Sequence, residues 1–170
     1  MTDSVATAMP TEGDTAPDLT LPDDTGAERH LSDRAGKWTV VYFYPEDDTS
    51  GCTKEACEFR DANAEYGIRD AEIWGVSKFG VGSKAAFKAK YGLNFVLLAD
   101  EDLAVSKRYG TWVEKNNYGK KSMGIQRSTF LVGPDGKVAH AWHRAKAEGH
   151  AQEVLDALDA AQSGKTASKT

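Results

Sequence analysis

The sequence contains little cysteine and no long apolar run, and each shortage excludes a class of protein. Only two of its 170 residues are cysteines, which excludes a scaffold held together by several disulfides. A chain of this length can bury enough apolar surface to fold as one domain without disulfides or a structural metal. No stretch approaches the roughly 20 apolar residues that a membrane-spanning helix needs.

The chain also lacks an excess of positive charge. Its net charge is −5, with 21 Lys and Arg against 26 Asp and Glu. Because there is no long basic run, neither nucleic acid nor a membrane is expected as a partner. We interpret the two locally basic stretches, SKAAFKAK at 83–90 and KKSMGIQR at 120–127, as solvated loops or helix faces.

The N-terminal stretch shows no targeting pattern. The first 18 residues have no apolar core of seven residues and no arginine, so they resemble neither a secretory signal nor a transit peptide. We therefore expect a cytoplasmic protein, in which a cysteine pair is more often catalytic or metal-binding than structural. Residues 1–12 and 162–170 are small, polar and aperiodic, which predicts loose tails around one domain at 13–161.

Strand-like and helix-like patterns alternate between these tails. Residues 38–44, WTVVYFY, form a continuous β-branched and aromatic run that is typical of a strand buried on both faces. Further strands are predicted at 72–77 and 94–100, strand pairs at 18–31 and 128–142, and helices at 52–67, 83–92, 101–110 and 149–161. Gly67 and Gly92 are the candidate C-caps of two of these helices. Alternation of this kind predicts an α/β fold with a mixed sheet.

Both cysteines lie in one acidic segment, YPEDDTSGCTKEACEFRD at 44–61. Cys52 follows a Thr-Ser-Gly turn, where the chain leaves a strand and enters a helix. Thr49 or Ser50 can cap this helix, which places the Cys52 sulfur in its first turn. Free N–H groups and the helix dipole favour a thiolate there, and the thiolate is the nucleophilic form of cysteine. Because the neighbouring carboxylates oppose this effect, an activated Cys52 also needs a cation from elsewhere in the chain.

Cys57 is five residues further along the same predicted helix. At that spacing the two Cα atoms lie about 8.6 Å apart, whereas a disulfide needs roughly 4.4–6.8 Å. The pair can therefore bridge only after the helix unwinds locally, as in a redox catalyst with a separate resolving cysteine. Cys57 could also be a small buried hydrophobe.

A metal site is the weakest interpretation of the cysteine pair. The C-x4-C spacing is not a usual chelating motif, and only two cysteines are present. His140 and His143 could supply further ligands, but on a strand they would face opposite sides. We expect no metal and no other cofactor.

The cysteine segment resembles the active-site segment of peroxiredoxins, specifically the bacterioferritin-comigratory or Q type. Pro45, Thr49 and Cys52 meet the family pattern P-x-x-x-[TS]-x-x-C, and a cysteine five residues later is typical of many members of that branch. The stretch IQRSTFLVGPDGKV at 125–138 resembles the family's later arginine segment, and APDLTLPDDTG at 16–26 resembles its opening. The similarity covers nearly the whole chain.

This resemblance implies a thioredoxin-like fold, with a central mixed sheet flanked by helices and an N-terminal β-hairpin. It implies that Cys52 is the peroxidatic cysteine, which becomes a sulfenic acid, and that Cys57 is the resolving cysteine of an intramolecular disulfide. Thr49 would orient the peroxide and Pro45 would shield the sulfur. Arg127 would hold the thiolate and stabilise charge on the leaving oxygen.

The resemblance also implies the partners. These are hydrogen peroxide or a small organic hydroperoxide as substrate, and thioredoxin or a similar dithiol as the reductant that recycles the disulfide. We expect a thioredoxin-dependent peroxiredoxin that is monomeric.

Each implied role has a simpler alternative. Thr49 could serve only as a helix cap, Pro45 could only end the strand, and Arg127 could form an ordinary surface ion pair. Arg60 and Lys54 are rival candidates for the cation.

The whole function also has an alternative from another class. A redox-responsive switch or chaperone-like binding protein could use the same cysteine pair without turnover. Such a switch needs no group that stabilises a leaving oxygen, so Arg127 favours the peroxidase.

Packing is the preferred role for Trp112. Ser50 stands where many relatives have proline, which leaves the catalytic groups intact but could loosen the turn before the helix.

Overall fold

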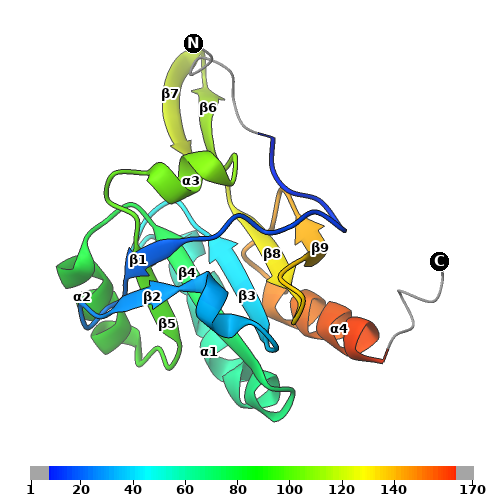
Figure 1. Ribbon diagram of the computed structural model, residues 1–170. Coiled ribbons are helices and arrows are strands. Elements are labelled where there is room, and N and C mark those ends of the chain that lie inside the picture. The colour runs from blue at the N-terminus through cyan, green and yellow to red at the C-terminus, as the bar shows by residue number, and fades with distance from the viewer. Residues whose placement is uncertain (1–7, 164–170) are drawn as a thin grey trace.

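Five strands form the central sheet of the computed structural model, which describes residues 8–163 (Figure 1). Their order across the sheet is β5-β4-β3-β8-β9. β3 pairs in parallel with β4, and β4 with β5, whereas β8 is antiparallel to both β3 and β9. The mixed sheet is therefore confirmed. The bounds of these strands are Trp38–Phe43 for β3, Ala71–Ser77 for β4, Val96–Ala99 for β5, Ser128–Val132 for β8 and Val138–Trp142 for β9.

The central strand β3 places apolar side chains on both faces of the sheet. Val40 and Tyr42 belong to one buried cluster, and Val41 and Phe43 to another. Side chains alternate across a strand, so a continuous apolar run requires a cover on each face. Helices cover the first face, while the N-terminal segment and a short helix cover the second. The bounds of the helices are Ser50–Ile68 for α1, Val81–Tyr91 for α2, Ala104–Arg108 for α3 and His150–Gln162 for α4.

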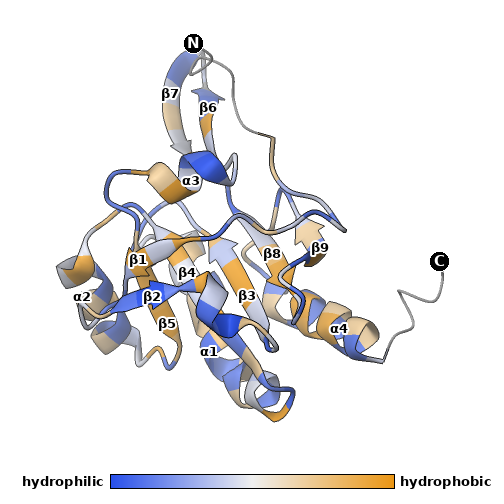
Figure 2. Ribbon diagram, viewed as in Figure 1, coloured by the Kyte–Doolittle hydropathy of each residue, from blue (hydrophilic) through white to orange (hydrophobic). Residues whose placement is uncertain are grey.

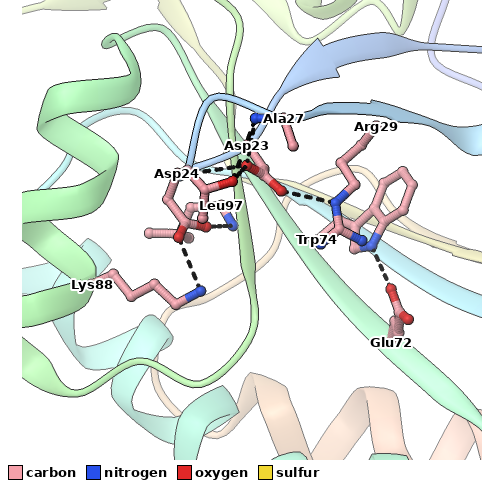
Figure 3. Close-up of polar contacts among 9 residues, drawn as sticks. Asp23, Asp24, Ala27, Arg29, Glu72, Trp74, Lys88 and Leu97 are labelled. Atoms are coloured by element: carbon pink, nitrogen blue, oxygen red, sulfur yellow. Dashed lines mark hydrogen bonds and ion pairs between the residues drawn. The ribbon is translucent and has the colours of Figure 1, made fainter.

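The predicted N-terminal hairpin is present as β1 (Thr20–Pro22) and β2 (Glu28–His30), followed by a 3-10 helix, η2 (Leu31–Arg34). Its turn is fastened to the sheet and to α2 (Figure 3). Asp24 accepts hydrogen bonds from Lys88 Nζ at 3.1 Å and from the Leu97 N–H at 3.3 Å. The hairpin is therefore an integral part of the fold.

A second hairpin, β6 (Trp112–Asn117) and β7 (Lys120–Ile125), corrects the interpretation of KKSMGIQR as a loop or helix face. Its strands pair only with each other, and it projects from the body of the molecule (Figure 1). Much of β7 is hydrophilic (Figure 2), so the sequence contains no apolar run that would predict a strand here. The turn at Tyr118 and Gly119 has φ of 56° and 84°, which is typical of a tight hairpin. In the sequence, Gly119 was a sign of this turn.

Of the two predicted glycine C-caps, one is confirmed and one is wrong. Gly92 caps α2 in the left-handed conformation, as predicted. The prediction that Gly67 caps α1 is wrong, because the helix continues to Ile68 and its cap is Arg69. The left-handed residue after this helix is Asp70, with φ of 58°, so no glycine was needed there.

The predicted tails lie largely outside the described residues, at 1–7 and 164–170. Within the described part of the N-terminal tail, Pro10 is buried and its carbonyl is 2.8 Å from His143 Nε2. The limits of the domain at 13–161 stay a prediction. Across residues 8–163, none of the helices has the length and apolar character required to cross a bilayer.

Candidate active site

The start of α1 positions Cys52. Thr49 is the N-cap, with an extended backbone (φ −90°, ψ 161°), and its carbonyl accepts the first helical hydrogen bond from the Thr53 N–H at 2.8 Å. Cys52 is the third residue of the helix and is only 2% exposed. The Thr49 hydroxyl does not cap the helix but donates to the Glu46 carbonyl at 3.4 Å. Its side chain is therefore not committed to capping.

Arg127 is the cation that faces the sulfur. It lies between β7 and β8, and its Nη2 is 3.3 Å from Cys52 Sγ. The Arg127 carbonyl accepts a hydrogen bond from the Ala145 N–H at 2.9 Å, which fixes the backbone from which the side chain extends. A side chain at Gly51 would place its Cβ 3.3 Å from Arg127 Nη2. The glycine before Cys52 therefore leaves room for the guanidinium.

The rival cations do not face Cys52. Arg60 donates to the Tyr91 carbonyl at 2.7 Å and pairs with Asp61 at 2.9 Å. Lys54 is exposed. Of the three candidates, the structure brings only Arg127 to the sulfur.

Glu55 is a site residue, although from the sequence we expect it only to be one of the carboxylates that oppose a thiolate at Cys52. It is fully buried one turn after Cys52, and its Oε1 is 2.5 Å from Arg127 Nη1. Burial raises the pKa of Glu55 to about 8, although the neighbouring Arg127 opposes this rise. Burial alone would lower the pKa of Arg127, but Glu55 and Cys52 outweigh it and raise that pKa. The spacing of three residues, which places two side chains on one helix face, was a usable signal for Glu55.

The other acidic neighbours of Cys52 are each engaged by a different group. Asp47 pairs with Lys84 at 3.1 Å, and Asp48 pairs with Lys90 at 2.8 Å. Glu58 accepts a hydrogen bond from the Gly149 N–H at 2.8 Å. The charges of Asp47 and Asp48 are each paired with a lysine, which reduces the opposition to a Cys52 thiolate that the composition suggests.

Pro45 and Thr49 lie at the two ends of a five-residue segment, loop 45–49, that joins β3 to α1. Pro45 is half-buried and Thr49 is exposed. Asp48 adopts a left-handed backbone with φ of 62°, a conformation that is uncommon for residues other than glycine, although aspartate adopts it more readily than most. Loop 45–49 is thus held in a specific conformation between a buried strand and the helix that carries Cys52.

Cys57 is not brought to Cys52. Both thiols are free, Cys57 is half-buried, and α1 is continuous through both positions. At helical spacing their Cα atoms lie about 8.6 Å apart, which is too far for a disulfide. Bridging therefore requires part of α1 to unwind.

The histidines considered as metal ligands have other partners. His140 Nδ1 is 3.0 Å from Glu12, and His143 contacts the Pro10 carbonyl. Trp112 packs against the cluster on the second face of the sheet, as expected.

Comparison with known proteins identifies the family of the chain. Residues 12–141 match the AhpC/TSA family. The chain is 45% identical over 146 residues to a putative peroxiredoxin bcp from Coxiella burnetii, an alignment covering 86% of this chain and 97% of the relative. It is 43% identical over 146 residues to peroxiredoxin Bcp from Bacillus subtilis, covering 86% and 93%.

Solved structures give the same result. Peroxiredoxin Q from Xanthomonas campestris superposes with a TM-score of 0.81 at 42% identity, covering 89% of this chain and 96% of that one. The fold is therefore the expected thioredoxin-like one, with an N-terminal hairpin. On sequence and fold, the chain belongs to the Bcp/PrxQ-type peroxiredoxins of the AhpC/TSA family and is a thiol peroxidase.

Proposed function

We propose that the protein reduces hydrogen peroxide and small organic hydroperoxides with Cys52 as peroxidatic and Cys57 as resolving cysteine. The observation that carries this proposal is the contact of 3.3 Å between Arg127 Nη2 and Cys52 Sγ at the start of α1. A guanidinium and a helix N-terminus at one sulfur both favour the thiolate.

In the first step, the Cys52 thiolate attacks the terminal oxygen of the hydroperoxide ROOH. The S–O bond forms as the O–O bond breaks, sulfur is oxidised to sulfenic acid, and the other oxygen leaves as ROH after taking up a proton. Arg127 stabilises the negative charge that develops on the leaving oxygen. Thr49, whose hydroxyl is exposed and does not cap the helix, orients the peroxide, and half-buried Pro45 limits the access of water to the sulfur.

In the second step, the Cys57 thiol attacks the sulfenic sulfur of Cys52. An S–S bond forms and water leaves, so the two-electron oxidation that the peroxide imposed on Cys52 is now shared by both sulfurs. Because both residues lie on the continuous helix α1, this step follows local unwinding of its first turns. Thioredoxin or a similar dithiol then reduces the disulfide and restores both thiols.

The substrate assignment also draws support from a relative. The bacterioferritin comigratory protein of Xanthomonas campestris, 41% identical and with a TM-score of 0.81, has alkyl peroxide reduction activity. We extend to this chain the reduction of small alkyl hydroperoxides, and we propose that it acts as a cytoplasmic monomer.

Rapid mixing tests the first step. Reduced protein is mixed with one equivalent of hydrogen peroxide and its tryptophan fluorescence is followed. We expect oxidation to be far faster than that of a free thiol. Arg127→Gln should slow it by roughly 100-fold or more, the usual effect of removing a donor that stabilises developing charge. Arg60→Gln is the matched control and should react like the wild type. Wild-type oxidation no faster than a free thiol would instead favour a redox switch without useful turnover.

Mass spectrometry tests the second step. The wild-type protein should lose about 2 Da after peroxide treatment, as expected for two thiols that become one disulfide. In Cys57→Ser, the first oxidation should survive, and Cys52 should stop at the sulfenic acid or become overoxidised. Full thioredoxin-linked cycling of this variant would remove Cys57 from the mechanism.

A further inference from the structure

We propose that Lys84 is a positioning residue: through a buried ion pair with Asp47 it holds loop 45–49 in the conformation that starts α1 at the reactive sulfur. This inference rests on the proposed peroxidase function. It also corrects the interpretation of SKAAFKAK as a solvated helix face, because Lys84 lies within that stretch and is completely buried.

The Lys84 ammonium is enclosed by polar and aromatic groups. Its Nζ is 3.1 Å from each carboxylate oxygen of Asp47, whose side chain is only 5% exposed. It also donates to the Ser77 hydroxyl and lies 5.3 Å from the centre of the Tyr44 ring. Burial lowers the pKa of Lys84, while Asp47 acts in the opposite direction. Removing either charge would leave the other one buried and unpaired.

Asp47 gathers further donors from the elements around loop 45–49. Its Oδ1 accepts a hydrogen bond from the Tyr44 hydroxyl at 2.6 Å, and its Oδ2 accepts one from the Ser83 hydroxyl at 2.5 Å. Tyr44 follows β3, and Ser83 lies in α2 together with Lys84. The carboxylate therefore ties the loop to both neighbouring elements at one point.

Stability alone is a poor explanation for this arrangement. Taking two charges out of water costs several kcal/mol per ion, and a well-packed apolar pair is often equally stable or more stable. An ion pair with fixed partners does, however, determine where Asp47 sits. We therefore infer that the Lys84–Asp47 pair serves to fix the position of Asp47.

The position of Asp47 bears directly on the start of α1. The next residue, Asp48, has a left-handed backbone, and the residue after it is the N-cap Thr49. A shift of loop 45–49 would move the Thr49 hydroxyl and the first turn of α1 relative to Arg127. The buried pair is attached before α1 begins, so it leaves the first turns of the helix free to unwind.

A neighbouring ion pair supplies a matched control. Asp48 is also held by α2, through Lys90 Nζ at 2.8 Å and the Tyr91 hydroxyl at 2.5 Å. The side chains of Lys90 and Asp48 are 59% and 40% exposed, so this pair is screened by solvent and should contribute little. Lys90→Met removes a lysine of the same helix that contacts the same loop, without opening a buried site.

The experiment compares two reactions of Cys52 in Lys84→Met, Lys90→Met and the wild type. Peroxide needs the correct placement of loop 45–49 and Arg127, whereas alkylation by iodoacetamide needs only an accessible thiolate. We expect Lys84→Met to lower the second-order rate constant for hydrogen peroxide at least tenfold and to change the alkylation rate less than threefold. Lys90→Met should change neither rate more than twofold. Once the sulfenic acid has formed, Lys84→Met should form the disulfide at the wild-type rate.

The double variant Asp47→Asn/Lys84→Met separates positioning from stability, because it leaves no buried charge unpaired. We expect its melting temperature to lie near that of the wild type while its peroxide rate stays low. A folded Lys84→Met with the wild-type peroxide rate, or a double variant that recovers both stability and rate, would overturn the inference. Slow oxidation of the wild type itself would instead refute the proposed function.

Discussion

Arg127 divides its guanidinium between a sulfur and a carboxylate. One terminal nitrogen contacts Cys52 and the other contacts Glu55. Among the described residues, the second Glu55 oxygen and the Tyr42 hydroxyl are buried without a hydrogen-bond partner. The Glu55 carboxylate therefore orients Arg127 from a strongly desolvated position. Desolvation makes the negative charge of Glu55 unfavourable in free energy.

Because this charge is unfavourable, we expect the free energy of unfolding to depend on pH, and Glu55→Gln should reduce that dependence. The pKa of Glu55 is raised to about 8 in the folded protein, above the ordinary value of 4.5. Between these values the folded state binds more protons than the unfolded state, so the free energy of unfolding falls as the pH rises. We expect urea unfolding to show a loss on the order of 3 kcal/mol between pH 5 and pH 8. This loss should shrink in Glu55→Gln.

Glu58→Gln removes a carboxylate from the same helix and is the control for this measurement. It should keep the wild-type pH dependence. An equal loss of stability in Glu55→Gln and in the wild type would mean that Glu55 does not carry the effect.

Helices and strands could be predicted from the sequence where a residue pattern has only one physical explanation. The run at 38–44 has to be buried on both faces, and the glycine after α2 permits a left-handed cap, so both were predicted. The hairpin β6–β7 was missed because its strands are polar and pair only with each other. The burial of Lys84 could not be predicted, because a lysine on a helix faces solvent unless a distant partner such as Asp47 is known.

The first turn of α1 is the element that should govern disulfide formation, and Ser50→Pro tests this. Ser50 is the first helical residue, where proline is favoured, and the extended backbone of Thr49 suits a residue before proline. The variant should be stabilised by about 0.5–1 kcal/mol. Unwinding should become harder, so quenched mass spectrometry should show slower Cys52–Cys57 bridging with peroxide oxidation nearly unchanged. Ser50→Ala is the control, and faster bridging in Ser50→Pro would contradict this account.

At the scale of the whole molecule, the sheet separates two buried clusters that have different roles. The cluster on the helix side includes Cys52 and continues into α1, α2 and α4. The opposite cluster is closed by the N-terminal segment, including Leu19 and Leu21. The turn of the N-terminal hairpin fastens this cover at the β5 edge of the sheet (Figure 3). The stability of the molecule therefore depends on contacts remote from the reactive sulfur.

The buried Asp23 carboxylate organises the turn of this hairpin, and it predicts how the molecule responds to acid. Its side chain is 4% exposed, and burial alone would raise its pKa, but hydrogen bonds from Thr25 and Arg29 outweigh burial and lower the pKa to about 2. The folded state therefore binds fewer protons than the unfolded state between pH 4 and pH 2. The resulting stabilisation is fully present above pH 4 and is lost as the pH falls toward 2.

Asp23→Asn should consequently lower the free energy of unfolding by about 2 kcal/mol at pH 7, measured by urea unfolding. The difference from the wild type should nearly vanish at pH 2, where the wild-type carboxylate is itself half protonated or more. Glu28→Gln, in the same hairpin but with a side chain that is 66% exposed, should show no such loss at either pH. Peroxide oxidation of folded Asp23→Asn should match the wild type, because the Asp23 carboxylate bonds residues of the hairpin turn at the β5 edge and none of the site residues. A pH-independent loss of stability would instead assign the effect to side-chain packing rather than to the buried charge.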